Sequence, residues 1–255
     1  MAIFSFFNEK GGAGKSLHSL LFGSYLAHNK GLKVCLVDFE PLPRLVPQRE
    51  DEDKLLEDTG SFLSRYLASH PQAGGVLDIF SAPSDLRQKG DRSTEDFRAA
   101  LDAYVNGLAE EYEYVIVDLP AEIRPEGVSF NFLFSCVDLV AVPFDCTPSV
   151  MRCAYNTVYT LSNMNIPVVM FWNKVSAADF KNPKYLDDLE EFFTWKSYDV
   201  LPHRIKFFKK AMRESDTMMF VVSTYCWPGR YIELTCPQLE LLYASLKERL
   251  DQYTV

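Results

Sequence analysis

The sequence contains cysteine but no cysteine motif. Its six cysteines are scattered along 255 residues, without a C-x-x-C pair or another close cluster. Zinc and iron–sulfur sites need clustered ligands, so this pattern argues against a metal centre of that kind. A chain of this length buries a sizeable core without disulfides. We therefore expect reduced thiols and a cytoplasmic location.

Long apolar runs and a basic N-terminal region are also missing. No apolar run approaches the ~18 residues that a membrane-spanning helix needs. The N-terminus lacks the basic stretch of a signal peptide, and a glycine-rich segment follows its first apolar run directly. We expect neither a signal peptide nor a membrane partner.

Positive charge is in the minority. The sequence has 26 Lys and Arg against 35 Asp and Glu, which gives a net charge of -9. This balance argues against a protein that nucleic acid covers over its whole surface. It leaves room for a local basic patch, because binding follows the local field and not the sum of charges.

Apolar, β-rich runs alternate with helical patterns along most of the chain. Consecutive apolar positions are typical of strands buried on both faces of a parallel sheet. The alternation predicts a doubly wound α/β fold, a mostly parallel sheet flanked by helices in a three-layer sandwich. The expected strands are 2–7, 33–38, 114–118, 137–144 and 167–173, with weaker candidates at 76–80 and 219–223; the expected helices are about 16–29, 94–111, 126–135, 148–163, 184–195 and 236–252.

One stretch interrupts this alternation. Residues 41–93 combine proline, glycine and mixed charge, including the run REDEDKLLED, which indicates surface loops around one or two short helices. A solvated helix start explains the charged run most simply, and a partner-binding insertion is the alternative. We expect a single domain over 1–255 that carries 41–93 as a loop-rich insertion.

A phosphate-binding loop follows the first expected strand. In NEKGGAGKSL, residues 8–17, the glycines let the backbone pass close around an anion, and the following helix points its free N–H groups at the same place. Lys15 can reach the outer phosphates of a nucleotide, and the Ser16 hydroxyl can bind Mg²⁺. Strand, glycine loop, G-K-S and helix in this order predict a P-loop NTPase, with a nucleotide-binding loop of Gly11, Gly12, Ala13, Gly14, Lys15, Ser16 and Leu17.

The loop departs from the strict motif in an informative way. Glu9 stands where G-x-x-x-x-G-K-[ST] has its first glycine, and the sequence reads K-G-G-x-G-K-S from Lys10 onward. This loop resembles the deviant Walker A motif of the ParA/MinD family of partition and positioning ATPases. The resemblance implies that Lys10 reaches across a nucleotide-sandwich homodimer to the partner's phosphates. Many relatives carry a hydroxyl residue at the position of Leu17, and leucine cannot donate that hydrogen bond to the inner phosphate.

Two further strand ends carry carboxylates that fit the resemblance. VCLVDFEP ends with Asp38 and Glu40, where the family usually has D-x-D and uses the second aspartate to position water. Glu40 is one methylene longer, which leaves the rate of hydrolysis open because hydrolysis depends on accurate water placement. YEYVIVDLPAE resembles a Walker B strand. The resemblance implies catalytic roles for Lys10, Asp38 and Glu40, and a Mg²⁺ site made by Ser16, Asp38 and Asp118.

The strand end VVMFWNKV offers a residue for the base. The Asn173 amide can read a purine edge, or it can simply open a turn. GTPases have N-K-x-D, but the fourth position here is Ser176, so adenine and therefore ATP is favoured over guanine. Relatives have a proline-containing loop near the base, and Pro202 occupies a similar place after another expected strand.

The densest basic cluster follows Pro202 and is a candidate DNA surface. ParA-like proteins bind DNA without sequence preference, and a solvated helix face is the alternative reading of this cluster. MinD proteins end in a basic amphipathic anchor, whereas the last expected helix here lacks that cationic bias and should pack on its own sheet. The candidate DNA-binding residues are Arg204, Lys206, Lys209, Lys210 and Arg213.

Three functional hypotheses remain. The first is a ParA-like, Mg²⁺-dependent ATPase that dimerises with ATP, hydrolyses it slowly, and partitions DNA or positions a transfer complex with a partner protein that stimulates hydrolysis. The transfer complex is included because residues 41–50 resemble the same segment in ParA-like proteins of bacterial conjugative elements. The second is an ATP-binding scaffold with little or no hydrolysis. The third is a small-molecule ligase similar to dethiobiotin synthetase, which would not need Lys10 in trans.

Overall fold

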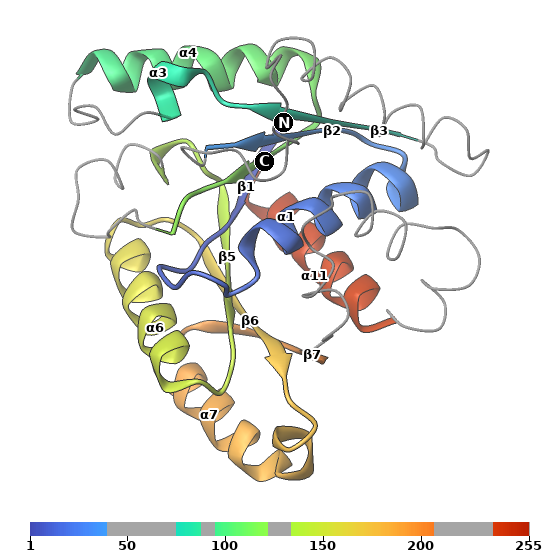
Figure 1. Ribbon diagram of the computed structural model, residues 1–255, viewed down its shortest axis with the longest axis vertical. Coiled ribbons are helices and arrows are strands. Elements are labelled where there is room, and N and C mark those ends of the chain that lie inside the picture. The colour runs from blue at the N-terminus through green and yellow to red at the C-terminus, as the bar shows by residue number, and fades with distance from the viewer. Residues whose placement is uncertain (40–74, 88–94, 122–133, 207–236, 255) are drawn as a thin grey trace, which may run out of the picture.

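The described part of the chain forms one parallel sheet between two layers of helices (Figure 1). The computed structural model describes residues 1–39, 75–87, 95–121, 134–206 and 237–254. The seven strands lie in the order β3-β2-β4-β1-β5-β6-β7, and every described pairing is parallel. This confirms the predicted doubly wound α/β fold. The strands are β1 Ala2–Phe6, β2 Lys33–Asp38, β3 Val76–Ser81, β4 Tyr114–Asp118, β5 Leu139–Phe144, β6 Val168–Val175 and β7 Asp199–Lys206.

The helices cover both faces of the sheet. On one face, α1 (Lys15–Ser24), the π-helical turn η1 (Tyr25–Asn29) and α11 (Pro237–Tyr253) share one apolar core. On the other face, α3 (Ser84–Arg87), α4 (Glu95–Glu111), α6 (Pro148–Asn163) and α7 (Pro183–Trp195) share the second (Figure 1). A short 3₁₀ turn, η2 (Asp179–Lys181), precedes α7. The sheet is therefore buried on both sides, as the continuous apolar runs of its strands require.

The central strand β1 shows how the two cores arise. Phe4 and Phe6 point to the α1 and α11 side, whereas Ile3 and Phe7 point to the opposite side. Side chains alternate across a strand, so a run of apolar residues supplies both faces at once. Each buried phenylalanine contributes roughly 1.5–3 kcal/mol by leaving water. These contacts fix the carboxyl end of β1, from which the glycine-rich loop departs.

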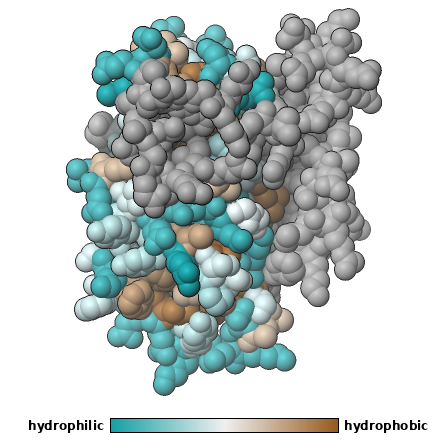
Figure 2. Space-filling view, turned by 60° about the vertical axis from the view of Figure 1, so that its left-hand side comes forward, coloured by the Kyte–Doolittle hydropathy of each residue, from teal (hydrophilic) through white to brown (hydrophobic). Residues whose placement is uncertain are grey.

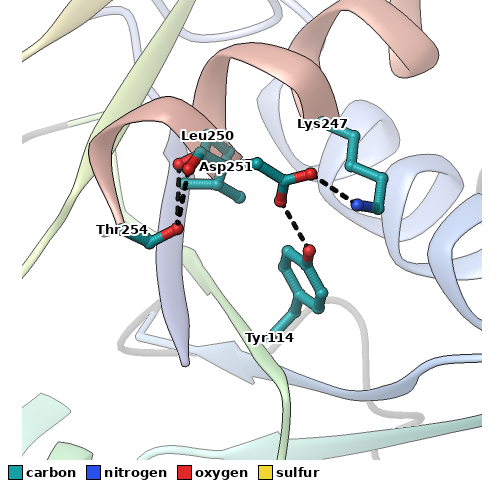
Figure 3. A network of polar contacts seen from close by, with 5 residues as sticks. All are labelled: Tyr114, Lys247, Leu250, Asp251 and Thr254. Carbon is teal, nitrogen blue, oxygen red and sulfur yellow. Dashed lines mark hydrogen bonds and ion pairs between the residues drawn. The ribbon is translucent and has the colours of Figure 1, made fainter.

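The C-terminal helix packs on the sheet, as its sequence predicts. Leu242, Leu246 and Leu250 of α11 are fully buried in the core that α11 shares with α1. At the end of the helix, Tyr114 donates a hydrogen bond of 2.7 Å to Asp251, and Lys247 donates one of 2.6 Å to its other oxygen (Figure 3). Among the described helices, none has the length and apolar character needed to span a membrane.

The strand expected before Pro202 is β7, which continues past that residue to Lys206. Proline removes a backbone donor and is tolerated mainly in edge strands and at bulges, so Pro202 weakens the strand signal. Among the described strands β7 lies at the end of the sheet, and the pairing slips between Leu201, opposite Phe171, and Arg204, opposite Trp172. Pro202 therefore lies in an irregular part of a strand and not in a loop after one. Residues 202–203 occupy this slip.

The stretch between β2 and α4 contains more regular structure than expected. The weak strand candidate at 76–80 is confirmed as β3, which pairs with β2 along its whole length. The short helix α3 follows it. Most of the proposed 41–93 insertion, the strand candidate 219–223 and all but the end of the helix candidate 126–135 lie outside the described residues.

The surface beside α6 and α7 carries exposed aromatic side chains: Tyr159, Tyr185, Phe192 and Trp195. Figure 2 brings this side forward and shows apolar residues lying among hydrophilic ones. Single exposed apolar side chains are normal on a protein surface. The exposed charges on and beside α7 are of both signs, with Lys184 and Lys196 near Asp188 and Glu191. The patch therefore gives no indication of a partner's charge.

Candidate functional site

The glycine-rich loop connects β1 to α1 in a conformation that needs glycine. Gly12 has φ 76° and Gly14 has φ 100°, both in the left-handed region that side chains disfavour. Gly14 caps α1, and its carbonyl accepts the first helical hydrogen bond from His18 N at 3.0 Å. The start of α1, with its free N–H groups, is therefore aimed into the loop, which is a suitable site for an anion.

The first half of the loop is tied to the neighbouring strand β5. The buried Asn8 side chain donates a hydrogen bond of 2.9 Å to the Pro143 carbonyl. Its oxygen accepts the Lys10 N–H at 2.9 Å. Phe7 N also donates to Ala141 O at 3.0 Å. These bonds fix the path of the backbone into the loop.

The second half of the loop is held by the end of β6. Asn173 donates a hydrogen bond of 2.7 Å from Nδ2 to the Ala13 carbonyl, and Lys174 donates from Nζ to the Gly12 carbonyl. Lys174 itself has φ 55°, which is uncommon for a residue with a side chain. A Cβ on Gly14 would lie only 2.5 Å from Asn173 Nδ2. The amide of Asn173 is therefore packed against the loop.

The two lysines of the loop lie in different surroundings. Lys15, the first residue of α1, is 6% exposed, and its charge is close enough to Asp118 to lower the pKa of that carboxyl. Lys10 is exposed to solvent. A buried ammonium beside a carboxylate suits a phosphate bound within the chain. An exposed one is available to a group outside the chain.

Two carboxylates meet at the carboxyl ends of β2 and β4. Asp38 and Asp118 are opposite one another in the register, and both are fully buried. Burial, and next the charge of Asp38, raise the pKa of Asp118 to about 7. Hydrogen bonds from Ser16 and Ser19 and the charge of Lys15 oppose this rise. The site thus holds two acids that repel one another unless a cation lies between or beside them.

One oxygen of this pair has no hydrogen-bond partner. Asp118 Oδ1 accepts from Ser19 Oγ at 3.2 Å, whereas Asp118 Oδ2 is buried without a partner in the structure. Such an orphaned oxygen is rare and points to a missing ligand. Mg²⁺ prefers carboxylate, hydroxyl, phosphate and water oxygens and uses only one or two carboxylates. The set Ser16, Asp38 and Asp118, with two carboxylates and one hydroxyl, fits Mg²⁺. A cluster of three or more His, Cys, Asp or Glu that could bind another metal does not occur among the described residues.

A buried histidine lies behind the loop. His18 is in the second turn of α1, with its ring against Phe6, Phe171 and Tyr243. Burial lowers the pKa of His18 to about 4, a hydrogen bond with Asn173 opposes this, and the charge of Lys174 lowers the pKa further. At neutral pH His18 is therefore uncharged.

Acid should destabilise the fold through His18. Its folded-state pKa is lower than the unfolded value of 6.5, so the unfolded chain binds more protons below that pH. The stability that the neutral ring contributes is complete above pH 6.5 and is lost as the pH falls toward 4. The loss is at most roughly 3 kcal/mol, as the shift implies. The titratable groups facing the ring are Lys174, whose charge lowers the pKa of His18, and Tyr243, whose hydroxyl lies 3.0 Å from Nδ1. Denaturant unfolding from pH 7.5 to 4.5 should show this component in the wild type and not in His18→Phe.

The other predicted residues fall in different places. Leu17 packs against the core shared by α1 and α11. Pro202 is exposed in β7, and no contact in the described residues places it at the loop. The Arg204 guanidinium lies 2.6 Å from Asp187 and 2.9 Å from Glu190 on α7, so its charge is already paired within the fold. Glu40, Lys209, Lys210, Arg213 and the side chain of Lys206 are outside the described residues.

Four residues of the site were not predicted from the sequence: Asn8, His18, Ser19 and Lys174. Asn8 and Lys174 bond the loop, Ser19 bonds Asp118, and His18 lies behind the loop with its ring bonded to Tyr243. A sequence signal exists for His18 alone, because it is a polar residue on the apolar face of the first helix. That signal tells nothing about its partner, Tyr243, which lies more than 200 positions away in the sequence.

Comparison with solved structures agrees with this architecture. A ParA family ATPase from Chlorobium tepidum TLS aligns with a TM-score of 0.62 and 17% identity, over 94% of this chain and 98% of that one. The MinC:MinD cell division complex of Aquifex aeolicus aligns with a TM-score of 0.63 and 18% identity, over 97% of this chain and 96% of that one. A putative plasmid partition protein of Borrelia burgdorferi B31, bound to AMPPNP, aligns with a TM-score of 0.62 and 16% identity, over 97% of this chain and 98% of that one.

No family model and no curated protein matches the sequence. The similarity is therefore one of fold: the chain has the P-loop fold found in ParA family ATPases, MinD and plasmid partition proteins.

Proposed function

We propose that this protein is an ATP-dependent dimerisation switch of the ParA kind. The observation that carries the proposal is the contrast between the two loop lysines, since Lys15 is buried beside Asp118 and Lys10 is exposed. A single chain needs one lysine to hold its own phosphates. An exposed second lysine at the same loop is suited to the phosphates of a second copy that faces it, where charge develops during phosphoryl transfer.

The site also suits ATP with Mg²⁺. The fold neighbour from Borrelia burgdorferi holds AMPPNP, an ATP analogue. Mg²⁺ would be held by Ser16, by Asp118 through water and by Asp38, and would supply positive charge to the phosphate oxygens. Lys15 would bind the outer phosphates of ATP, and the backbone N–H groups of the loop would surround the remaining phosphate oxygens. Asp38 and Glu40 would orient the attacking water.

The work of the switch would be partition of DNA or positioning of a transfer complex. The ATP-bound dimer would bind DNA without sequence preference and meet a partner protein that accelerates hydrolysis. The basic residues proposed for DNA are Lys206, Lys209, Lys210 and Arg213. Arg204 is left out of this set, because Asp187 and Glu190 already neutralise it.

The test is the oligomeric state, measured by light scattering with ATP-Mg²⁺, with ADP-Mg²⁺ and without nucleotide. We expect the wild type to form a dimer with ATP only. Lys10→Ala should remain monomeric while its ATP affinity changes less than about threefold, because Lys15 still holds the phosphates. Phosphate release, measured in the same samples, separates a switch that turns over from a scaffold that does not.

Lys184→Ala is the matched control, since it removes an exposed lysine from α7. It should dimerise as the wild type does. If the oligomeric state of the wild type ignores ATP, the switch is wrong, and a small-molecule ligase on the same fold becomes the better hypothesis. If Lys10→Ala dimerises normally, Lys10 does not act across the interface.

A further inference from the structure

A continuous set of hydrogen bonds joins the C-terminal helix to the phosphate-binding loop. The Tyr243 hydroxyl of α11 lies 3.0 Å from His18 Nδ1 on α1. The His18 ring lies next to the Asn173 amide at the end of β6, because a Cβ added to Gly14 would meet Asn173 Nδ2 at 2.5 Å and His18 Cδ2 at 3.5 Å. A hydrogen bond with the Asn173 side chain also raises the pKa of His18. Asn173 donates to the Ala13 carbonyl at 2.7 Å. Segments from both ends of the chain therefore meet behind the loop.

The direction of these bonds follows from the chemistry of the groups. Asn173 uses its NH₂ group on Ala13, which leaves its oxygen to accept from His18. A neutral ring has one donor and one acceptor, so Nδ1 accepts the Tyr243 hydroxyl. Every donor in the series then points toward the loop.

The His18 ring has little freedom to turn. It is 2% exposed and contacts Phe6 at 5.6 Å and Phe171 at 5.0 Å between ring centroids. A Cβ added to Gly14 would meet His18 Cδ2 at 3.5 Å. The imidazole therefore fills the space directly under the first turn of α1.

We propose that His18 is a positioning residue for the phosphate-binding loop: held by Tyr243, it fixes the Asn173 amide against Ala13 and so keeps the loop in its anion-binding shape. The inference rests on the proposed binding of ATP at this loop. It assigns Asn173 to the phosphate end of the site, because its amide donates to the Ala13 carbonyl and packs against Gly14. Asn173 then supports every ligand that carries the phosphates, whatever its base.

The experiment compares two ligands, ATP-Mg²⁺ and inorganic triphosphate with Mg²⁺, by calorimetry or by competition with a fluorescent ATP analogue. His18→Phe keeps an aromatic ring but removes both polar bonds, and we expect about tenfold weaker binding of both ligands. Asn173→Ala should lose a similar factor for both. His18→Gln retains a donor for Asn173 and should recover part of the affinity. Tyr243→Phe, which removes one hydroxyl, should weaken both ligands by about threefold.

Tyr25→Phe is the matched control for Tyr243→Phe. Tyr25 packs against the ring of Tyr243 from η1, with 5.8 Å between centroids, and its substitution should leave both affinities unchanged. Amide hydrogen exchange of residues 11–14 in the nucleotide-free protein gives a readout that does not need ATP. Exchange there should be faster in His18→Phe and Tyr243→Phe than in the wild type and Tyr25→Phe.

The outcomes separate the two proposals. If His18→Phe and Asn173→Ala lose affinity for ATP and keep their affinity for triphosphate, Asn173 reads the base and the positioning role is overturned. Equal affinities and equal exchange in all variants would overturn it as well. A wild type that binds neither ligand would overturn ATP binding alone, because the exchange comparison would still show whether His18 holds the loop.

Discussion

Replacing Asp118 with asparagine should stabilise the nucleotide-free protein and, at the same time, remove most of its Mg²⁺-dependent nucleotide binding. Asp118 is fully buried opposite Asp38, and its pKa of about 7 shows how unfavourable its charge is in the metal-free site. At pH 8 the wild type must carry that charge. We expect Asp118→Asn to raise the free energy of unfolding by on the order of 2 kcal/mol.

The same change should weaken ATP binding in the presence of Mg²⁺ by roughly 10–100-fold, the usual effect of removing a carboxylate that orients a metal or its water. Binding measured in EDTA should change little or improve, since a negative charge near the phosphates is gone. Denaturant unfolding at pH 8 and ATP titrations with and without Mg²⁺ measure the two effects. Opposite signs for stability and function are a stringent requirement, because general damage to the fold lowers both.

Asp138→Asn is the matched control for this prediction. Asp138 precedes β5 at the opposite end of the strands, where it accepts the Ile3 N–H at 2.7 Å. Its substitution should lower the stability and leave the Mg²⁺ dependence of binding unchanged. If Asp118→Asn instead destabilises the protein and keeps the wild-type response to Mg²⁺, the carboxylate pair is a structural feature and not a metal site.

The parts of this molecule that the sequence predicts best are those governed by local pattern. A strand buried on both faces needs consecutive apolar residues, and the glycine loop needs flexible positions before a helix; both signals are contained in a few neighbouring residues. The resemblance implied one Mg²⁺ site for Asp38 and Asp118, and the ends of parallel strands lie at the same edge of a sheet. The structure brings them into direct register.

The parts that were missed depend on pairing between distant segments. The continuation of β7 past Pro202 was missed because a proline counts against a strand, and the slipped register at the end of the described sheet makes it acceptable. For Asn173 the sequence left a base-reading role and a turn-opening role open, and neither includes the contact of its amide with Ala13. Arg204 was assigned to a basic surface, although two acids of α7 face it. No local pattern carries such contacts.

A graded series of alanines in the loop should show which glycine the site depends on most. Gly14→Ala faces two costs: a positive φ of 100° and a Cβ only 2.5 Å from Asn173 Nδ2. Gly12→Ala faces only the positive φ of 76°, with no other atom within 4 Å, and Gly11→Ala faces neither. In the nucleotide-free protein we expect Gly11→Ala to change stability by less than about 1 kcal/mol. Gly12→Ala should cost about 1 kcal/mol, and Gly14→Ala about 3 kcal/mol.

The affinities for ATP should single out the same glycine. Gly14→Ala must push the Asn173 amide away from Ala13 or shift the start of α1, so the loop loses its shape and ATP binding should fall at least about 100-fold. Combining it with Asn173→Ala removes the clashing atom, and the double variant should be no less stable than Gly14→Ala alone, a departure from additivity that identifies direct contact. If Gly14→Ala is no worse than Gly12→Ala in either measurement, backbone strain alone limits the loop and the Asn173 amide does not pack against it in solution.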